Sequence, residues 1–431
     1  MKASSCRDRL ERALARIADP KGEGARACLS VYAEAARVAA DAADGRKVRG
    51  ASRGPLDGMI ISIKDLFDLA GEPTRAGSKI LAEEAVPAAD DATVVQRLRH
   101  AGAVIIAKTN MTEFAFSGIG ANPHFGTPGN PHDRQRAPGG SSAGAPVAVA
   151  DSMCEISIGT DTGGSVRVPA ALCGLVGFKP SRQRVPTKGA FPLSKTLDSI
   201  GPIARSVADC AKADAVMAGE EFAPLEPIAL AGLRFGIAEG LPLGGLDEIV
   251  SPAFAAAIGR LDNAGVRISR DTLSPLDDMI AVNERGGVVP PEACALHRDR
   301  LRRRAADVDP NVRARIERGC AVAEADYSEI LRERDRLVSI MDARLKELDA
   351  LVMPTCAIVA PVLADVADPK VFAARNAAVL RNTSIVNFFD LCAISLPLAA
   401  ALPVGLMLVA RNDQDRRLLG IAAAVSQLLA A

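Results

Sequence analysis

Residues 159–169 read GTDTGGSVRVP, and residues 139–144 read GGSSAG. Each stretch holds a serine directly behind two glycines, and the segment 154–158 predicts a short strand that enters the first of them. Glycine adopts positive φ readily and allows close approach, so such loops can direct backbone N–H groups at a ligand. A serine among those groups could attack a carbonyl carbon while they stabilise the developing oxyanion. The first hypothesis is therefore acyl transfer, which requires a base for the serine.

A histidine base is disfavoured, and a lysine base is the alternative. The four histidines, at positions 100, 124, 132 and 297, lack metal-ligand spacing, and an ordinary structural role is predicted for each. A lysine can serve as the base if burial keeps it neutral near pH 7. Lys64 is the strongest candidate because it ends the apolar segment 59–63 and precedes Asp65. A lysine at a strand end is more often a solvated terminus, and the residues alone favour that interpretation.

Other catalytic motifs are absent or lack their context. Residues 140–144 match G-x-S-x-G around Ser142, but that nucleophile elbow needs a preceding strand and a late histidine. Residues 130–138 are polar and rich in proline, and the only histidine downstream is His297. No P-loop, complete G-x-G-x-x-G or S-x-x-K pattern occurs. The two glycine–serine loops could also be simple tight turns.

The composition excludes several classes of partner. Lys plus Arg and Asp plus Glu both total 52, so no net field favours nucleic acid or an anionic membrane. Aromatic residues make up 3% of the chain and Trp is absent, which argues against a stacking surface for bases. The N-terminus lacks the apolar segment of a secretory signal, and the apolar run 394–410 contains two prolines that favour two buried strands joined by a tight turn. We expect a soluble, cytoplasmic protein.

The cysteines predict buried thiols. Nine are present, they are scattered, and none forms a C-x-x-C pair. This pattern favours free thiols in a reducing compartment over disulfides or a zinc site. No metal is expected.

Helical and strand patterns alternate along the chain, which predicts an α/β fold with a layered sheet. Segment 114–136 is predicted to be loop, and 240–310 is the least legible part. The predicted helices span 6–18, 27–44, 91–100, 207–217 and 323–348, and the predicted strands span 59–63, 103–107, 154–158, 233–238 and 350–353.

Spaced blocks carry a resemblance to a known family. In chain order they are GMIISIKD (58–65), GAVIIAKTN (102–110), GGSS (139–142), GTDTGGSVRVP (159–169), GLVGFKP (174–180), LDSIGP (197–202) and LPVGLM (402–407). The chain resembles the amidase signature family, densely over about 55–215, more weakly around 323–356 and 381–410, and unconvincingly over 240–310. The resemblance implies a large mixed, mostly parallel central β-sheet covered by helices on both faces.

One amidase domain over residues 1–431 is expected. Its predicted parts are N-terminal helices (1–50), a catalytic signature core (51–215), a peripheral lobe (216–320), and a C-terminal helix with strands that complete the sheet (321–431).

The resemblance also implies a Ser–cisSer–Lys triad. Ser165 matches the nucleophile, Ser141 the bridging cis-serine and Lys64 the base. The N–H groups of the loop would form the oxyanion hole, and three further residues would support the site. The oxyanion residues are Thr162, Gly163, Gly164 and Ser165, and the supporting residues are Ser142, Asp161 and Arg167.

The sequence departs from the family pattern near the cis-serine. Ala143 stands where glycine is expected, and Pro146 where a small residue is usual. If position 143 needs positive φ, alanine adds strain of roughly 1 kcal/mol. The turn between Pro397 and Pro403 is apolar, so we expect it to be buried.

The expected function is hydrolysis of a small or medium carboxamide to a carboxylate and ammonia or an amine, through an acyl-enzyme on Ser165. The alternative is an amidase that resembles the A subunit of glutamyl-tRNA amidotransferase and works within a complex. A non-catalytic protein of this fold would lack a triad residue, and none is missing. No cofactor is expected, the expected partner is a small amide, and homodimerisation is left open. The acyl pocket is predicted at Met111, Phe114, Ala115 and Phe116, which could equally be ordinary core.

Overall fold

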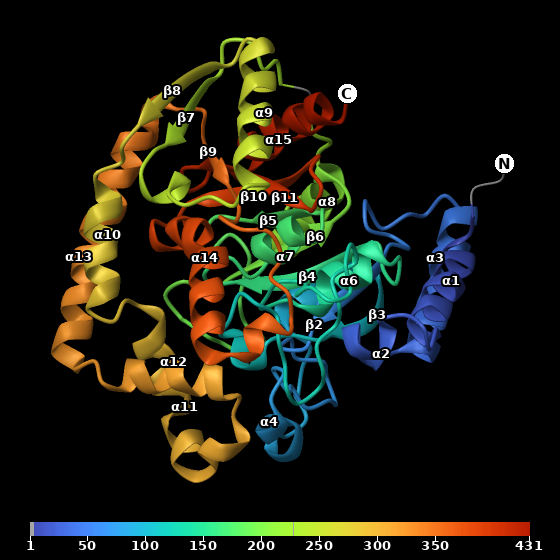
Figure 1. Ribbon diagram of the computed structural model, residues 1–431. Coiled ribbons are helices and arrows are strands. Elements are labelled where there is room, and N and C mark those ends of the chain that lie inside the picture. The colour runs from blue at the N-terminus through green and yellow to red at the C-terminus, as the bar shows by residue number, and fades with distance from the viewer. Residues whose placement is uncertain (1–3, 227) are drawn as a thin grey trace.

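A single sheet organises the molecule (Figure 1). The computed structural model describes residues 4–226 and 228–431, and these residues form one sheet of 11 strands. Its strands are β1 (Cys28–Val31), β2 (Ile60–Lys64), β3 (Val104–Thr109), β4 (Ile156–Asp161), β5 (Val176–Lys179), β6 (Ser199–Ala204), β7 (Arg234–Ala238), β8 (Arg267–Asp271), β9 (Ala350–Pro354), β10 (Cys392–Leu398) and β11 (Val404–Ala410).

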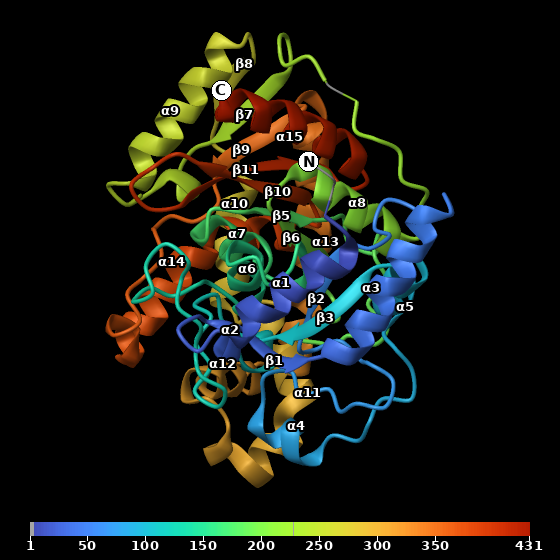
Figure 2. The same ribbon diagram turned by 90° about the vertical axis from the view of Figure 1, so that its right-hand side faces the viewer.

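The strand order is β1-β3-β2-β4-β6-β5-β10-β11-β9-β7-β8, which runs from bottom to top in Figure 2. The prediction of a mixed sheet is confirmed. Parallel pairs do not dominate: among the described strands, six neighbouring pairs are antiparallel and four are parallel. The C-terminal β10–β11 hairpin enters the middle of the sheet, where it adds antiparallel pairings with β5 and β9.

Helices pack on both faces of the sheet because its strands are apolar on both sides. Val104 and Ile106 of β3 join a cluster with α1, α3 and α6, whereas Ile105 between them joins the cluster with α5, α8 and α15. This period-2 division is typical of a strand buried on both faces. The helices are α1 (Cys6–Ala18), α2 (Gly24–Ala27), α3 (Ala33–Val48), α4 (Lys79–Glu84), α5 (Thr93–His100), α6 (Gly144–Ala150), α7 (Arg167–Leu172), α8 (Val207–Ala218), α9 (Val250–Asn263), α10 (Pro275–Glu284), α11 (Val289–Arg304), α12 (Pro310–Cys320), α13 (Glu324–Arg344), α14 (Pro369–Phe388) and α15 (Asp415–Ala430).

The predicted helix over 27–44 begins too early. The structure places strand β1 at residues 28–31 and starts helix α3 at Ala33. Strand β1 forms by antiparallel pairing with β3, in which Cys28 lies opposite Thr109. That pairing joins segments about 80 residues apart, so local periodicity does not reveal it.

The poorly legible segment 240–310 has regular structure. Strand β8 continues the sheet edge beside β7, and helices α9, α10 and α11 follow the same part of the chain. Helix α11 packs against α12 to form a unit at the bottom of Figure 1, which we call the α11–α12 hairpin, residues 289–320.

A disulfide between Cys294 and Cys320 closes the α11–α12 hairpin, so the prediction that all the cysteines are free thiols is wrong. The other seven cysteines are free and buried, as predicted. The two linked residues are 26 positions apart and meet only because the helices fold back on each other.

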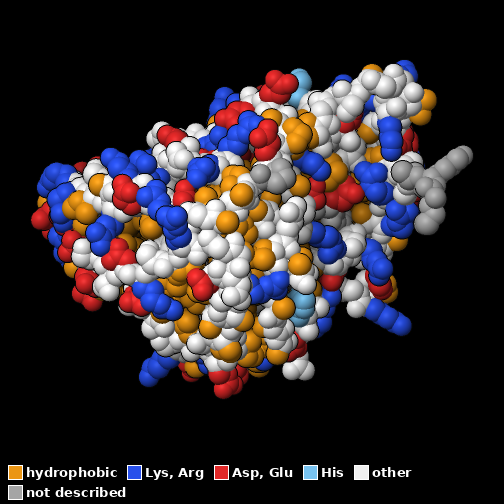
Figure 3. Space-filling view, turned by 90° about the horizontal axis from the view of Figure 1, so that it is seen from above, with side chains coloured by type: hydrophobic (Ala, Val, Ile, Leu, Met, Phe, Trp, Pro, Cys, Tyr) orange, Lys and Arg blue, Asp and Glu red, His pale blue; other side chains and the backbone are white. Residues whose placement is uncertain are grey.

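The two C-terminal strands predicted within 394–410 are confirmed as β10 and β11. The turn between them is not buried: Ala399, Ala400 and Ala401 are exposed. No helix among the described residues is both long and apolar enough to cross a membrane. Acidic and basic side chains are interspersed on the face shown in Figure 3, in keeping with the balanced composition.

Candidate active site

Three adjacent strands of the sheet position the site. Strands β2, β4 and β6 are neighbours in the sheet. Lys64 is the last residue of β2, and β4 leads directly into the loop that carries Ser165. Because β2 and β4 are parallel, their carboxyl ends meet at the same edge of the sheet. Residues predicted from separate motifs therefore come together there.

Lys64 is a buried base candidate rather than a solvated strand end. Its side chain has no exposed surface, and its Nζ atom donates hydrogen bonds to Ser141 Oγ (2.8 Å) and Thr160 Oγ1 (2.9 Å). Burial lowers the pKa of Lys64 to about 7, against the opposing negative charges of Asp198 and Asp161. A substantial fraction of this amine is therefore neutral at neutral pH.

The Ser141 loop has the geometry expected of a cis-serine. The peptide bond between Gly140 and Ser141 is cis, and Ser141 is fully buried. The expected strain at Ala143 is absent, because its φ is −64° and its conformation is right-handed helical. Ser142 is buried, but its Oγ finds no hydrogen-bond partner among the described residues, so its predicted supporting role has no polar contact behind it.

The two glycine–serine loops lie against each other. A Cβ atom on Gly139 would come within 2.9 Å of the Pro169 Cα, and one on Gly159 would come within 2.6 Å of Ser142 Oγ. Glycine at these positions is what permits the close packing. Ser165 is 4% exposed and lies in the turn between β4 and α7.

Asp161 fixes the loop that carries Ser165 by accepting hydrogen bonds from backbone N–H groups. Its carboxylate accepts from the N–H of Gly164 (2.9 Å) and of Val166 (3.2 Å). The Gly164 N–H is therefore not available to an oxyanion, contrary to its predicted role. Among the described residues, the N–H groups of Thr162, Gly163 and Ser165 have no protein acceptor.

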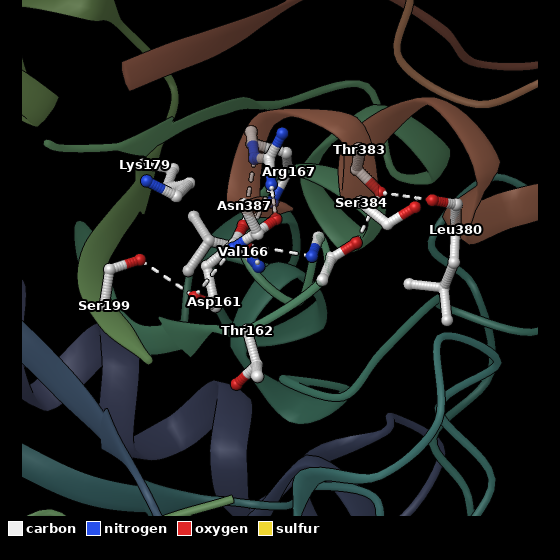
Figure 4. Close-up of polar contacts among 12 residues, drawn as sticks. Asp161, Thr162, Val166, Arg167, Lys179, Ser199, Leu380, Thr383, Ser384 and Asn387 are labelled. Atoms are coloured by element: carbon white, nitrogen blue, oxygen red, sulfur yellow. Dashed lines mark hydrogen bonds and ion pairs between the residues drawn. The ribbon is translucent and has the colours of Figure 1, made fainter. Parts of the chain in front are cut away.

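A buried ion pair stands behind this loop (Figure 4). Arg167 donates from Nε and Nη2 to the two carboxylate oxygens of Asp161, at 3.0 and 2.9 Å, and neither side chain is exposed. Asn387 of α14 accepts from Arg167 (2.6 Å) and donates to Asp161 (2.9 Å). Burial opposes the ionisation of Asp161, but the Arg167 guanidinium outweighs it and holds the pKa of Asp161 at about 2.

Helix α14 also contacts the backbone of the same loop. Thr383 Oγ1 donates to the carbonyl oxygen of Gly163 (2.7 Å), and Figure 4 shows Thr383 beside the loop. Neither Thr383 nor Asn387 was predicted as a site residue, because both lie more than 200 positions from Ser165 and belong to no local motif.

The four predicted pocket residues, Met111, Phe114, Ala115 and Phe116, are buried in the largest hydrophobic cluster. The segment that carries them is attached to the Ser141 loop, since the Thr112 N–H donates to the Ser141 carbonyl (2.9 Å). The Phe114 ring packs 4.0 Å from the His297 ring of α11. His297 is fully buried, and its Nε2 has no hydrogen-bond partner among the described residues.

Arg315 of α12 is a polar group that the sequence did not single out. Its guanidinium lies 4.4 Å from the centre of the Phe116 ring. The Arg315 side chain is half-buried, and among the described residues its Nε atom is buried without a hydrogen-bond partner. Burial lowers the pKa of Arg315 to about 10. A guanidinium beside an aromatic ring is a ready partner for an anionic group of a ligand.

A surface cavity of about 520 Å³ opens elsewhere, between α1 and the start of α8, and contains none of the predicted site residues. It is lined by Arg9, Arg12, Ala13, Arg16, Met59, Ile60, Ser152, Cys154, Glu155, Arg205 and Asp209.

The family model described as Amidase matches residues 8–419 of this chain. The chain belongs to the amidase family. Its members hydrolyse C–N bonds, and this amidase is accordingly a hydrolase of such bonds.

Two enzymes of known name and one solved structure are among those similar to this amidase. The 2-amino-5-chloromuconic acid deaminase of Comamonas testosteroni is 36% identical over 404 residues, which cover 91% of this chain and 86% of that protein. The A subunit of the glutamyl-tRNA(Gln) amidotransferase of Anaeromyxobacter sp. (strain K) is 43% identical over 281 residues, or 62% of this chain and 56% of that protein. The crystal structure of an amidase superimposes with a TM-score of 0.88 at 34% identity, covering 99% of this chain and 96% of that one.

Proposed function

We propose that this amidase hydrolyses a small carboxamide through an acyl-enzyme on Ser165, with Ser141 as proton relay and Lys64 as base. The observation that carries the proposal is the buried Lys64 amine, which is 2.8 Å from Ser141 Oγ. A serine hydroxyl is a weak nucleophile until a neighbouring base accepts its proton. A lysine whose pKa is near 7 has the proton affinity that general-base catalysis at neutral pH requires.

The proposed proton path runs from Ser165 through Ser141 to Lys64. The lone pair of neutral Lys64 accepts the Ser141 proton while Ser141 accepts the proton of Ser165. Ser165 Oγ then attacks the carbonyl carbon of the substrate and forms the C–O bond of a tetrahedral intermediate. The C–N bond breaks as the relay returns a proton to the departing nitrogen. Water enters by the same path in reverse and releases the carboxylate.

Three N–H groups are available to stabilise the oxyanion. Those of Thr162, Gly163 and Ser165 have no protein acceptor among the described residues, whereas that of Gly164 is bound by Asp161. Preorganised donors of this kind are worth on the order of 10²–10³ in rate each. The buried Asp161–Arg167 pair and Thr383 keep the loop in place for this role.

The substrate class that fits best is an amide that also carries a carboxylate. Arg315 offers a guanidinium over Phe116, in the segment attached to the Ser141 loop, and its Nε has no hydrogen-bond partner among the described residues. Arginine binds carboxylates through two parallel hydrogen bonds. The relative from Comamonas testosteroni is named for an acid, 2-amino-5-chloromuconic acid, which supports the same class.

The first experiment compares wild type with Ser165→Ala and measures ammonia release from a panel of aliphatic, aromatic and dicarboxylic monoamides. We expect the variant to lose at least about 10³-fold in kcat while its circular dichroism spectrum is unchanged. Release of ammonia at the wild-type rate by folded Ser165→Ala protein would refute the proposal.

A second experiment tests the carboxylate with succinamate and butyramide, which match in length and differ in charge. Arg315→Met should raise KM for succinamate by about 10- to 100-fold, the loss expected for a charged hydrogen bond, and should leave KM for butyramide unchanged. Arg318→Met is the matched control because Arg318 lies on the same helix and is exposed. Equal effects on both amides would show that Arg315 serves packing only.

The similarity to the A subunit of glutamyl-tRNA(Gln) amidotransferase leaves one competing function, an amidase that works within a complex. The purified chain alone decides between them. Ammonia release from simple amides without any partner supports the free-standing hydrolase, whereas activity that appears only with a partner protein supports the complex.

A further inference from the structure

Asp198 takes no part in the proposed proton path, yet it contacts the loop that carries Ser165 and its charge acts on Lys64. It directly precedes β6, and Ser199 of β6 pairs with Asp161 of β4. Asp198 therefore lies next to Thr162, the residue that follows Asp161. Its Oδ1 accepts a hydrogen bond from Thr162 Oγ1 at 2.5 Å.

The second carboxylate oxygen is also engaged. Asp198 Oδ2 accepts from the N–H groups of Leu193 (2.9 Å) and Ser194 (3.1 Å). These contacts hold the carboxylate in one orientation, so the hydroxyl of Thr162 is held as well. Because Thr162 contributes an N–H group to the proposed oxyanion hole, Asp198 restrains the loop that must receive the substrate oxygen.

Asp198 is also the carboxylate near Lys64 that lacks a cationic partner. Two negative charges favour the protonated form of Lys64, those of Asp198 and Asp161. Asp161 is neutralised by its ion pair with Arg167, whereas among the described residues Asp198 forms no ion pair. Among the described residues, Glu292 of α11 also acts on Asp198, and its charge is negative as well.

Burial is consistent with this interpretation. It raises the pKa of Asp198 to about 6, against the hydrogen bonds from Thr162, Leu193 and Ser194 that favour the carboxylate. Asp198 is therefore charged at and above neutral pH, where Lys64 must lose its proton to act as base. Its charge opposes that loss.

We propose that Asp198 is a positioning residue that acts through Thr162 and Lys64, an inference that rests on the proposed function. Its carboxylate fixes Thr162 in the oxyanion loop, and its negative charge, which has no ion-pair partner among the described residues, favours the ammonium form of Lys64. A purely structural role, in which Asp198 only closes the turn at 193–198, would affect folding and would leave the pH dependence of the reaction unchanged.

The experiment measures kcat, KM and the pH profile of kcat/KM for Asp198→Asn, with Thr162→Val as its matched control. Asparagine removes the charge, so Lys64 loses its proton more easily and the acidic limb should move to lower pH by roughly 1 unit. The disturbed contact with Thr162 should lower kcat by roughly 10- to 100-fold with little change in KM. Thr162→Val keeps the charge, so it should lower kcat similarly and leave the acidic limb in place.

Specific outcomes would overturn the inference. If Asp198→Asn is active and its acidic limb stays at the wild-type pH, the inferred effect of Asp198 on Lys64 is refuted. If Thr162→Val has the wild-type kcat, the inferred effect of Asp198 on the oxyanion loop is refuted. If Asp198→Asn does not fold, Asp198→Glu replaces it: the limb should stay at the wild-type pH while kcat falls, and an unchanged kcat refutes the positioning of Thr162. Activity that survives Ser165→Ala instead refutes the proposed function itself, so the two failures are distinguishable.

Discussion

Lys64 Nζ lies 2.8 Å from Ser141 Oγ, although the two residues are 77 positions apart in the chain. The contact is completely buried and joins the end of β2 to a loop that contains a cis peptide bond. An ammonium group in this place would lack a carboxylate partner at hydrogen-bond distance, since its two acceptors are the hydroxyls of Ser141 and Thr160. The environment therefore favours the neutral amine, which is the form that can act as a base.

The pH dependence of this amidase should follow Lys64. With a pKa lowered by burial to about 7, kcat/KM should rise about tenfold per pH unit below that value and level off above it. Lys64→Met should reduce kcat by roughly 10²–10⁴-fold, the usual contribution of a general base. Lys64→Arg is the matched control: it keeps a long cationic side chain that does not deprotonate in this range, so it should be equally inactive. A rate that is constant from about pH 5 to 9 would contradict a lysine base.

Gly164→Ala should impair both stability and activity. Gly164 has φ of +136°, and a Cβ there would come within 2.1 Å of Thr383 Oγ1. We expect the free energy of unfolding to fall by roughly 1–3 kcal/mol, measured by urea titration, because both the backbone and the packing oppose the side chain. Gly163→Ala is the control, since its Cβ would meet no atom within 4 Å. Equal stability of the two variants would contradict this account.

Asp161→Asn should be among the most destabilising single substitutions. It leaves the Arg167 guanidinium buried without a counter-charge, which typically costs about 3–5 kcal/mol. The pKa of Asp161 falls from 3.8 to about 2 on folding, so its stabilising contribution is present above pH 4 and is lost as the pH falls towards 2. Urea titrations of wild type and variant should therefore differ most above pH 4 and converge below it. Glu347→Gln removes an ion pair of an 86% exposed carboxylate and should change stability by less than about 1 kcal/mol.

The disulfide can be detected by counting the free thiols. Thiol titration of the unfolded, unreduced protein should find 7 free cysteines, and reduction should raise the number to 9. Cys294→Ser should lower the free energy of unfolding by about 2–4 kcal/mol, because a closed loop of this length restricts the unfolded chain. Cys210→Ser, at a buried free thiol, is the control: it keeps the Cys294–Cys320 disulfide, so reductant should still lower its free energy of unfolding, whereas Cys294→Ser should not respond to reductant. Nine free thiols before reduction would show that the hairpin is not linked.

Local patterns predicted the central strands and the two serine loops well. Apolar runs such as 59–63 identify strands buried on both faces, and paired glycines mark the loops that follow. The antiparallel entry of β10 and β11, the strand β1 and the Cys294–Cys320 link all depend on pairings between distant segments, which no local period records.

Within the site, the residue types were predictable from local motifs, but several contacts were not. Ala143 could not be assigned a φ from its neighbours, and it proved to be helical. The Gly164 N–H was expected to face an oxyanion, whereas in the structure it donates to Asp161. Arg315 lies 150 residues from Ser165 in a segment without a recognisable motif, and only its position over Phe116 draws attention to it.

The two helices of the α11–α12 hairpin are linked to each other by a disulfide and by close packing. Besides the disulfide, Gly319 lies so close to Pro290 that a Cβ there would come within 1.9 Å of the Pro290 carbonyl oxygen. The hairpin meets the proposed pocket through His297 and Arg315, while the residues proposed to perform the chemistry lie on strands and loops from the first half of the chain. Substitutions in the α11–α12 hairpin can therefore change the lining of the proposed pocket without displacing Lys64, Ser141 or Ser165. Exchanging residues 289–320 between related amidases is accordingly a direct way to exchange their substrate preferences.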